Sequence, residues 1–329
     1  MNYNVAVVGA TGMVGRKFIE VLEERNFPID KIYFFASGRS AGSVLKFKGQ
    51  EIVVEELKEE NIKPKKIHFA LFSAGGDISK TFAPVFVKYG ATVIDNSSAW
   101  RMDPEVPLVV PEVNPEDIKW NKGIIANPNC STIQAMVALK PLYDKYGIKR
   151  IIYSTYQAVS GAGLKGYEDL KEGYKGVAPK KFSSPIAGNL IPHIDVFQEN
   201  GYTKEEMKMI DETKKILHND NLKITATTVR VPVFYGHSES INVELEKSFE
   251  LDAIFELYKN APGVILKDDV ANLVYPMPID AAGHDEVFVG RIRRDFSLDN
   301  GVNLWVVADN IRKGAASNAV QIAECMIEK

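Results

Sequence analysis

The chain has 329 residues, which is long for one compact domain, so two domains are expected. Its 40 Lys and Arg residues nearly balance its 43 Asp and Glu residues, and the formal net charge of −3 gives no electrostatic basis for binding nucleic acid or an acidic membrane. Two cysteines are too few for a disulfide framework or a cysteine-rich site, and no metal is expected. The start MNYNVAVVGA lacks a signal-peptide pattern, and no apolar run reaches the roughly 18–20 residues of a membrane helix, so a reduced, cytoplasmic protein is expected.

The first third of the chain alternates short apolar runs with helical patterns. The expected strands are 4–10, 31–36, 67–73, 92–95, 108–110 and 123–126, and the expected helices are 16–25 and 80–89. Continuous apolar strands separated by helices predict a parallel sheet that is buried on both faces. This is a Rossmann-like, doubly wound α/β arrangement, whose ligand crevice lies at the carboxyl ends of the strands.

The second half has longer strand-like runs, which favour an α+β domain with a mixed, largely antiparallel sheet covered on one face. The expected strands are 151–159, 224–233, 241–245, 287–293 and 303–308, and the expected helices are 132–146, 205–217 and 315–328. Pro141 is expected to bend or split the first of these helices. Cys325 is expected on the apolar face of the last helix, where a cysteine serves packing.

The stretch Gly9–Gly15, GATGMVG, follows the first strand and opens the first helix. Its spacing is G-x-x-G-x-x-G. Glycines let the backbone approach a pyrophosphate, and the free N–H groups at the start of a helix attract anionic charge. In this strand–turn–helix context the pattern predicts a dinucleotide site.

The end of the second strand indicates which dinucleotide binds. An NAD site typically places an acidic residue there for the ribose 2′-hydroxyl, but the segment 36–42, ASGRSAG, contains none. Arg39, flanked by Ser37 and Ser40, is suited to a 2′-phosphate through charge-assisted hydrogen bonds. The sequence therefore favours NADP over NAD.

Cys130 lies in ANPNCST, between a predicted parallel strand and the helix 131–146. A helix N-terminus lowers a thiol pKa, and this position is at the crevice end of the sheet. Asn129 and the backbone N–H of Ser131 or Thr132 are candidate donors to an oxyanion. The alternative is that these residues only cap the helix.

A thiolate that attacks an aldehyde is expected to need a base, and His237 is the candidate. It follows Arg230 by seven residues in VRVPVFYGH, and an arginine and a histidine near one loop suit a carboxylate clamp and a general base. His68, by contrast, is expected in a buried strand. Two more stretches are expected at the crevice: the glycine-rich turn of 156–163, YQAVSGAG, and Arg101.

These motifs make the chain resemble the aspartate-semialdehyde dehydrogenase family over nearly its whole length. The matching stretches are VAVVGATGMVG, FFASGRSAG, DNSSAWRMDPEVPLVVPEVN, GIIANPNCSTIQ, STYQAVSGAG, EEMKMIDETKKIL and VRVPVFYGHSES. The resemblance implies NADP-dependent interconversion of L-aspartate 4-semialdehyde plus phosphate with L-4-aspartyl phosphate. In the reductive direction this reaction lies on the route to lysine, through diaminopimelate, and to threonine and methionine.

Catalytic roles are expected for four residues, three of them implied by the resemblance and Asn129 by its position beside Cys130. Cys130 is the nucleophile that forms a thioacyl intermediate, and Gln157 orients that intermediate. His237 is the acid/base, with a pKa near neutrality. Asn129 joins this catalytic group as a donor.

Substrate and cofactor contacts follow in the same way. Arg230 is expected to grip the α-carboxylate and Glu205 the α-ammonium, while Arg101 and Lys208 hold the phosphate. A surface ion pair is the alternative for Glu205 and Lys208, which are three residues apart on a helix. The residues implied at the NADP site are Gly9, Thr11, Gly12, Met13, Val14, Ser37, Arg39, Ser40, Ser73, Gly75, Ser160, Gly161 and Asn310. Asn318 is a rival to Asn310.

The family fold implies the domain boundaries and the assembly. Residues 1–130 form the NADP-binding domain, which the C-terminal helix 311–329 completes, and residues 131–310 form the catalytic and dimerisation domain. A homodimer is expected, and pairing of dimers into tetramers stays open. The other expected partners are small-molecule substrates.

Three alternatives come from the same sequence. A short-chain-type reductase would use Tyr167 and Lys171 with Ser154 upstream, but this leaves Cys130 and His237 without a role. An N-acetyl-gamma-glutamyl-phosphate reductase shares the thiol chemistry, but its acylated substrate nitrogen carries no charge for an acidic side chain. The third is a nucleotide sensor without catalysis, for which the chain offers no DNA-reading module.

Overall fold

The computed structural model describes residues 2–327 and divides into two compact units. Unit 1 comprises Met1–Pro128 and Ala315–Lys329, and unit 2 comprises Asn129–Gly314. The sequence placed these divisions after residue 130 and before residue 311. None of the helices that the structure describes is long and apolar enough to cross a membrane.

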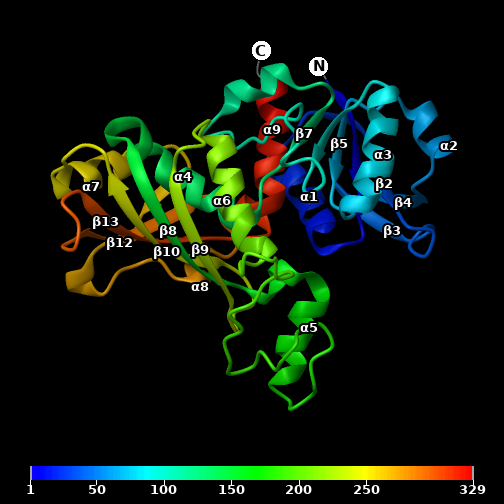
Figure 1. Cartoon of the computed structure of the whole chain (residues 1–329). Helices are drawn as coiled ribbons and strands as arrows, with labels where there is room; N and C mark the ends of the chain where they lie inside the picture. Colours follow the sequence, from blue (N-terminus) through cyan, green and yellow to red (C-terminus); the bar gives the residue numbers. More distant parts are fainter. Residues whose placement is uncertain (1, 328–329) are drawn as a thin grey trace. The chain divides into compact units, whose positions relative to one another are not determined.

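Unit 1 is built on a seven-stranded sheet in the order β3-β4-β2-β1-β5-β6-β7 (Figure 1). Its strands are β1 Tyr3–Val8, β2 Ile29–Ala36, β3 Val44–Phe47, β4 Gln50–Glu56, β5 Phe69–Phe72, β6 Thr92–Asp95 and β7 Ile124–Ala126. All neighbouring pairs are parallel except the edge pair β3–β4. The Rossmann-like prediction is therefore confirmed, with one antiparallel strand added at the edge.

Helices cover both faces of this sheet. They are α1 Met13–Glu24, α2 Glu59–Ile62, α3 Gly76–Lys88 and α9 Ser317–Ile327, with short 3₁₀ segments at Lys63–Lys65 and Pro115–Trp120. On one face α1 and α9 bury Phe18 and Val320 against Val5 and Val7 of β1. On the other face, residues of α2 and α3 pack against the alternate side chains of the same strands. Burial on both faces is the reason that the strands are uniformly apolar.

Unit 2 has a six-stranded mixed sheet in the order β11-β12-β13-β10-β8-β9. Its strands are β8 Ile148–Gln157, β9 Lys223–Arg230, β10 His237–Leu245, β11 Val264–Leu266, β12 Val287–Asp295 and β13 Gly301–Ala308. The central pairs are antiparallel, whereas β8–β9 and β11–β12 are parallel. Burial alternates along β8 and β10, so one face of this sheet packs against the core. The mixed-sheet prediction is confirmed.

The longest helix of unit 2, α4, has 17 residues. The helices of unit 2 are α4 Cys130–Tyr146, α5 Gly163–Gly173, α6 Lys204–Ile216, α7 Leu251–Lys259 and α8 Pro278–Ala281, with 3₁₀ turns at Val159–Ala162 and Val270–Asn272. A π-helical segment at Arg312–Ala316 continues into α9. The helix α4 runs through Pro141 as a single element, so the proline does not split it, and the alternative expectation of a bend stays a prediction. Buried side chains on both sides of the proline hold its two halves in one core.

Several local predictions need correction. The sequence missed β3, β4, β11, α2, α5, α7 and α8, and residues 108–110 form only an isolated bridge, between Leu108 and Ala126. His68 is exposed rather than buried, although its Nδ1 accepts a hydrogen bond from the backbone of Asn4. Cys325 is partly buried and packs against the core cluster of unit 1, as predicted.

Candidate active site

The glycine loop of unit 1 leaves the start of α1 open. Gly9 has φ +81°, and a Cβ built there would lie 2.3 Å from the Ser73 carbonyl oxygen, so only glycine fits. Gly12 precedes α1 without a side-chain cap, and the first turn, which begins with Met13, contains no acidic residue. The N–H groups of this turn therefore have no competing side-chain acceptor, which suits a bound anion. Thr11 and Val14 lie at the same place, one in the loop and one in the first turn.

The neighbouring loops complete the carboxyl edge of this sheet. Ser73 directly follows β5, and Gly75 begins α3 with φ +90°. At the end of β2, Ser37 and Arg39 are exposed, and Ser40 is partly buried. These residues fit a nicotinamide dinucleotide, because backbone donors and one cation converge where a doubly wound sheet takes its ligand.

One acidic residue at this edge escaped the sequence analysis. Glu56 ends β4, which pairs with β2, and a Cβ built on Gly38 would lie 3.0 Å from its Oε1 atom. The Glu56 carboxylate forms an ion pair of 2.8 Å with Lys58. The segment 36–42 itself lacks an acid, but the adjacent strand supplies one beside Gly38, the residue that precedes Arg39.

In unit 2, Cys130 begins α4, and Asn129 caps that helix. The Asn129 Oδ1 atom accepts hydrogen bonds from the backbone N–H of Ser131 at 3.0 Å and of Thr132 at 3.4 Å. The sequence suggested these two N–H groups as donors to an oxyanion. In the structure they donate to the Asn129 side chain instead, as the alternative of a helix cap predicts. Cys130 is partly buried, and Gly314 packs against it.

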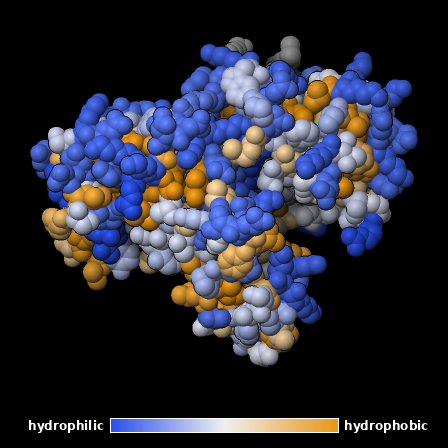
Figure 2. Space-filling model, in the orientation of Figure 1, coloured by the Kyte–Doolittle hydropathy of each residue, from blue (hydrophilic) through white to orange (hydrophobic). Residues whose placement is uncertain are grey.

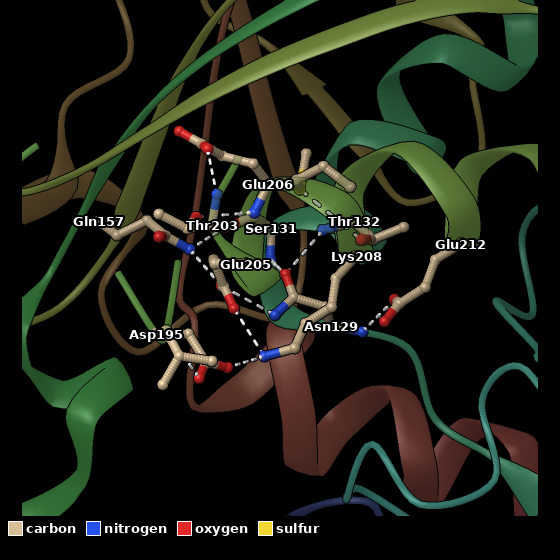
Figure 3. A network of polar contacts seen from close by, with 12 residues as sticks. Asn129, Ser131, Thr132, Gln157, Asp195, Thr203, Glu205, Glu206, Lys208 and Glu212 are labelled. Atoms are coloured by element: carbon tan, nitrogen blue, oxygen red, sulfur yellow. Dashed lines mark hydrogen bonds and ion pairs between the residues drawn. The ribbon is translucent and has the colours of Figure 1, made fainter. Parts of the chain in front are cut away.

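A buried ion pair lies beside the start of α4 (Figure 3). The Glu205 carboxylate accepts from Lys208 Nζ at 2.9 Å, from Gln157 Nε2 at 3.0 Å and from Asn129 Nδ2 at 3.0 Å. Burial alone would raise the pKa of Glu205, but the charge of Lys208 and these hydrogen bonds outweigh burial and lower the pKa to about 2. The carboxylate is therefore ionised throughout the physiological range.

Lys208 is shared between two carboxylates. Its ammonium lies 2.9 Å from Glu205 and 2.9 Å from Asp195, which carries a left-handed φ of +68° in the loop before α6. Burial opposes its charge, but both carboxylates raise the pKa of Lys208 above its ordinary value. Because Glu205 is only 5% exposed, this pair is not the solvated surface ion pair that sequence spacing allowed.

The hydrogen bonds of Gln157 decide which way its amide points. Its Nε2 group donates to Glu205 and to the Ser131 hydroxyl, and an ionised carboxylate can only accept. Its Oε1 atom is buried and has no hydrogen-bond partner among the described residues. Gln157 therefore presents an acceptor, and not a donor, to a ligand.

Arg230 ends β9 and His237 begins β10, the two strands that flank β8 in the sheet. A Cβ built on Gly161 would lie 2.9 Å from Arg230 Nη1 and 3.1 Å from His237 Nε2, so the glycine turn packs against both. Arg230 is 5% exposed, and its Nη1 donates to the Ala158 carbonyl oxygen at 2.7 Å. Burial lowers the pKa of Arg230, whereas the Glu205 and Cys130 charges raise it, which indicates that Cys130 is near this guanidinium.

His237 differs from the sequence expectation. It is the first residue of β10, it is fully buried, and its Nδ1 accepts from the Ala158 backbone N–H at 3.0 Å. Burial, followed by the Arg230 charge, lowers the pKa of His237 to about 3 rather than leaving it near neutrality. The neutral ring must then carry its proton on Nε2, which has no partner among the described residues.

The two rival asparagines occupy different units. Asn310 of unit 2 donates to the Ser160 hydroxyl at 2.9 Å and accepts from the backbone N–H of Gly236 at 3.0 Å. Asn318 of unit 1 donates to the carbonyl oxygen of Val109 and to the Asn127 side chain. Only Asn310 is thus grouped with Ser160 and the adjacent Gly161.

Arg101 belongs to unit 1, whereas Lys208 belongs to unit 2. Its guanidinium is buried and donates to the carbonyl oxygens of Asn127 at 3.0 Å and Asn96 at 2.7 Å, in the loops after β7 and β6. The structure therefore places it at the carboxyl edge of the first sheet. Its relation to the substrate stays a prediction.

Two buried carboxylates near the site were missed. Glu212 is 1% exposed, and its Oε2 accepts the backbone N–H of Asn129 at 2.7 Å. Glu239 lies two residues after His237 on the same face of β10; burial raises its pKa well above the ordinary value, and its oxygens have no partner among the described residues. The sequence shows each as one acid in a charged or polar run, with no signal that it would be buried. No group of three or more potential metal-ligating His, Cys, Asp or Glu side chains occurs in residues 2–327.

Comparison with known proteins assigns the chain to a family. Residues 4–121 match the model described as semialdehyde dehydrogenase, NAD binding domain, and residues 139–313 match semialdehyde dehydrogenase, dimerisation domain. The aspartate-semialdehyde dehydrogenase of Aquifex aeolicus is 62% identical over 100% of this chain and 99% of its own length. A crystal structure of aspartate semialdehyde dehydrogenase II complexed with ASA, from Vibrio cholerae, is 48% identical, with a TM-score of 0.96, over 100% of this chain and 99% of that one. The Candida albicans enzyme, solved with NADP, is 27% identical with a TM-score of 0.79, over 99% of both chains.

The fold and the two matched domains define the class first: an oxidoreductase of the semialdehyde dehydrogenase type with a nicotinamide-dinucleotide-binding domain. Within that class, the chain belongs to the aspartate-semialdehyde dehydrogenase family. Membership of this family argues against the short-chain-type reductase, in which Ser154 and Tyr167 would belong to one catalytic group. Ser154 lies in the middle of β8, and the Tyr167 ring packs instead against the rings of Phe234 and Tyr235.

Proposed function

We propose that this chain catalyses the NADP-dependent, reversible reductive dephosphorylation of L-4-aspartyl phosphate to L-aspartate 4-semialdehyde, on the route to lysine, threonine and methionine. The observation that carries the proposal is the buried cluster at the start of α4. There a thiol, an ionised carboxylate and a guanidinium lie within one unit of a chain that is 62% identical to a named aspartate-semialdehyde dehydrogenase.

The charges of the cluster complement the substrate. An aspartyl substrate carries an α-carboxylate and an α-ammonium. Arg230 forms no ion pair with a carboxylate in the described part of the chain, so its remaining N–H groups are free to bind the α-carboxylate. Glu205 and the free Oε1 of Gln157 are two acceptors for the α-ammonium. An N-acylated nitrogen would have no charge to offer Glu205, which disfavours the N-acetyl-gamma-glutamyl-phosphate alternative.

Cys130 is the proposed nucleophile. Its position at a helix N-terminus and its electrostatic interaction with Arg230 both favour the thiolate. A sulfur lone pair forms the bond to the acyl carbon, and the carbon–oxygen bond to phosphate breaks with its electron pair leaving on the phosphate. Lys208 is the proposed ligand of that phosphate in unit 2, and Arg101 is the proposed ligand in unit 1. The product of this step is a thioester on Cys130.

His237 acts in this proposal as a hydrogen-bond donor. Because Nδ1 is occupied by the Ala158 N–H, the neutral ring offers Nε2–H to the substrate acyl oxygen as negative charge develops there. A nicotinamide dinucleotide held at the glycine loop would supply hydride for reduction of the thioester carbon. When the carbon–sulfur bond then breaks, its electron pair returns to sulfur, the alkoxide becomes the aldehyde, and Cys130 is again a thiolate. No proton needs to pass through Nδ1 in these steps.

NADP is the proposed form of the dinucleotide, and Arg39 with Ser37 and Ser40 is the proposed site for its 2′-phosphate. Glu56 is the opposing feature, since a carboxylate near Gly38 repels a phosphate. The ion pair with Lys58 offsets part of this repulsion. The proposal is therefore a preference for NADP over NAD that depends on Arg39.

The active form is proposed to be a homodimer joined through unit 2. Figure 2 shows hydrophobic residues exposed around α5. Those with large exposed side chains in this segment are Leu164, Tyr174, Val177 and Leu190. An apolar surface of this kind is typical of a protein interface, and residues 139–313 match a dimerisation domain. Sedimentation analysis of the purified chain measures the assembly directly.

The deciding experiment is an absorbance assay of NADPH formation from aspartate semialdehyde, NADP and phosphate. Formation should require phosphate and should fall to background in Cys130→Ala. Intact-mass analysis after rapid quenching should detect the acylated wild-type chain. Turnover without phosphate, or undiminished turnover by Cys130→Ala, would contradict the proposal. N-acetyl-glutamate semialdehyde is the comparison substrate, and a preference for it would favour the rival activity.

A further inference from the structure

The first turn of α4 is held from the side by α6. Three residues of α6 contact it: Glu212 accepts the Asn129 backbone N–H at 2.7 Å, Glu205 accepts the Asn129 side-chain amide at 3.0 Å, and Met209 Sδ lies 3.7 Å from the Thr132 hydroxyl (Figure 3 draws the first two contacts). Spacings of three, four and seven residues put these side chains on one face of a helix. A single face of α6 therefore lies along the start of α4.

Asn129 is consequently restrained at three of its polar groups. Its backbone N–H and its side-chain Nδ2 donate to the two carboxylates, and its Oδ1 accepts from Ser131 and Thr132. Since Asn129 immediately precedes Cys130, these bonds restrict the backbone from which the sulfur projects. A charge-assisted hydrogen bond is shorter and stronger than a neutral one, and the bond from Asn129 N to Glu212 is the shortest of the set.

Glu212 differs from Glu205 in what it can do. Glu205 also contacts Gln157 and Lys208 and is already proposed to bind substrate, whereas Glu212 accepts a backbone N–H of the loop that carries the nucleophile. A negative charge near Cys130 opposes thiolate formation, so electrostatic activation of the thiol does not explain this residue. A neutral acceptor could also accept the Asn129 N–H. A buried carboxylate makes this hydrogen bond stronger and restrains the backbone more firmly.

We propose that Glu212 is a positioning residue for the nucleophile, which fixes Asn129 so that the Cys130 sulfur faces the acyl carbon of the bound substrate. The catalytic part of this inference rests on the proposed function. Its structural part, the orientation and reactivity of the Cys130 thiol, does not.

The test compares Glu212→Ala and Glu212→Gln with Glu206→Ala in the full-length protein. Glu206 is the matched control: it is a buried carboxylate of the same helix that also accepts backbone N–H groups, but those belong to Thr203 and Thr228. Two readouts are needed. One is the rate at which iodoacetamide alkylates Cys130, resolved by peptide mass analysis with Cys325 as internal reference, and the other is kcat and KM with aspartate semialdehyde.

Glu212→Ala should lower kcat by about 10- to 100-fold with KM changed less than about threefold, because a displaced nucleophile loses reaction geometry and not substrate contacts. It should also change the Cys130 alkylation rate relative to Cys325. Glu212→Gln should stay within about threefold of wild-type kcat, because its amide oxygen can accept the same N–H. Glu206→Ala should lower the melting temperature yet keep kcat and alkylation near wild type.

The inference is overturned if Glu212→Ala retains wild-type kcat and alkylation, or if Glu206→Ala reproduces its losses, since a general loss of packing would then explain both. If Glu212→Ala does not fold, Glu212→Asp replaces it, because the shorter side chain withdraws the carboxylate by one methylene. Glu212→Asp should then lower kcat and change the alkylation rate of Cys130, and wild-type values of both would overturn the inference. If the wild-type protein has no semialdehyde activity, the proposed function fails on its own, and the alkylation readout still tests the positioning of Cys130.

Discussion

Two helices that each follow a parallel strand begin in opposite ways. The helix α1 begins after Gly12, with no side-chain cap and no acidic residue in its first turn. The helix α4 begins after Asn129, whose side chain accepts two of its N–H groups and whose own backbone is held by Glu212. An open start leaves donors for an anion that arrives from solution, whereas a closed start uses its donors to fix a side chain.

The difference explains why two similar positions favour different chemistry. A capping side chain stabilises a helix by about 1 kcal/mol, and α1 lacks that contribution. In α4 the cap and the carboxylates of α6 make the backbone around Cys130 rigid, which suits covalent chemistry. The predictions below test this contrast, beginning with the largest expected effect.

The largest effect is expected when the Cys130 sulfur is removed from the start of α4. Cys130→Ala should reduce kcat/KM with aspartate semialdehyde by roughly 10³-fold or more, because the covalent route is lost. Cys325→Ala is the control and should leave kcat/KM within about twofold, since that thiol packs in the core of unit 1. Equal activity of the two variants would remove the basis for treating α4 as the catalytic helix.

The second test concerns His237, the proposed hydrogen-bond donor. His237→Ala should lower kcat by about 10²- to 10³-fold, as expected for loss of a donor to a developing oxyanion. His237→Gln should retain clearly more activity, because an amide N–H can donate although it cannot act as a base. If both variants lose activity equally, with a wild-type pH profile that titrates near neutrality, His237 would be a general base instead.

A third test uses the pH dependence of folding stability. The imidazole of His237 has a pKa of about 3 when folded and 6.5 when unfolded, so its stabilising contribution is complete above pH 6.5 and declines as pH falls toward 3. At pH 5 the loss relative to pH 7.5 should be about 2 kcal/mol in the free energy of unfolding. Urea denaturation of wild type and His237→Gln at both pH values measures it, and an identical pH dependence in both proteins would contradict the buried neutral ring.

The open start can be tested at its first glycine. Gly9→Ala should destabilise the protein by about 2 kcal/mol or more, because φ +81° disfavours a side chain and the new Cβ would meet the Ser73 carbonyl. Gly90→Ala is the matched control, since Gly90 has φ +88° and open space around a Cβ. Urea denaturation and calorimetric NADP binding should separate them, with binding impaired only by the change at Gly9. Similar binding losses in both would show that strain alone accounts for the effect.

The smallest expected effect is at the end of β2. Arg39→Ala should lower kcat/KM for NADP by about 10-fold, the size of one charge-assisted contact, and leave NAD nearly unchanged. Glu56→Gln should act in the opposite direction and raise the NADP/NAD ratio a few-fold. An unchanged ratio in both variants would mean that cofactor preference is decided elsewhere.

The sequence supported much of the fold and of the site because those features are local. Apolar runs separated by helical patterns identify a doubly wound sheet, and the glycine loop is recognised from three positions in seven residues. Cys130 stood out because a thiol between a strand and a helix has few roles. Family resemblance then pointed to Glu205, Lys208 and Arg230, which lie far from Cys130 in the chain and next to it in unit 2.

Burial and pairing could not be derived in the same way. His237 was expected in a turn with a near-neutral pKa, but strand pairing with β13 draws it into the core, and burial there favours the neutral ring. Glu56 is separated by 17 residues from Arg39 and reaches the cofactor edge only because β4 pairs with β2. Glu212 and Glu239 carry no distinguishing local pattern at all.

By itself, then, the sequence determined the class of fold and the strand–turn–helix context of the glycine loop, and it named the candidate reactive groups, because backbone freedom, helix ends and side-chain chemistry are properties of short segments. Only the tertiary structure decided the charge of His237, the direction of the Gln157 amide and the hold of Glu212 on Asn129. Desolvation and hydrogen-bond geometry depend on neighbours from other helices and strands, and those neighbours exist only once the chain has folded.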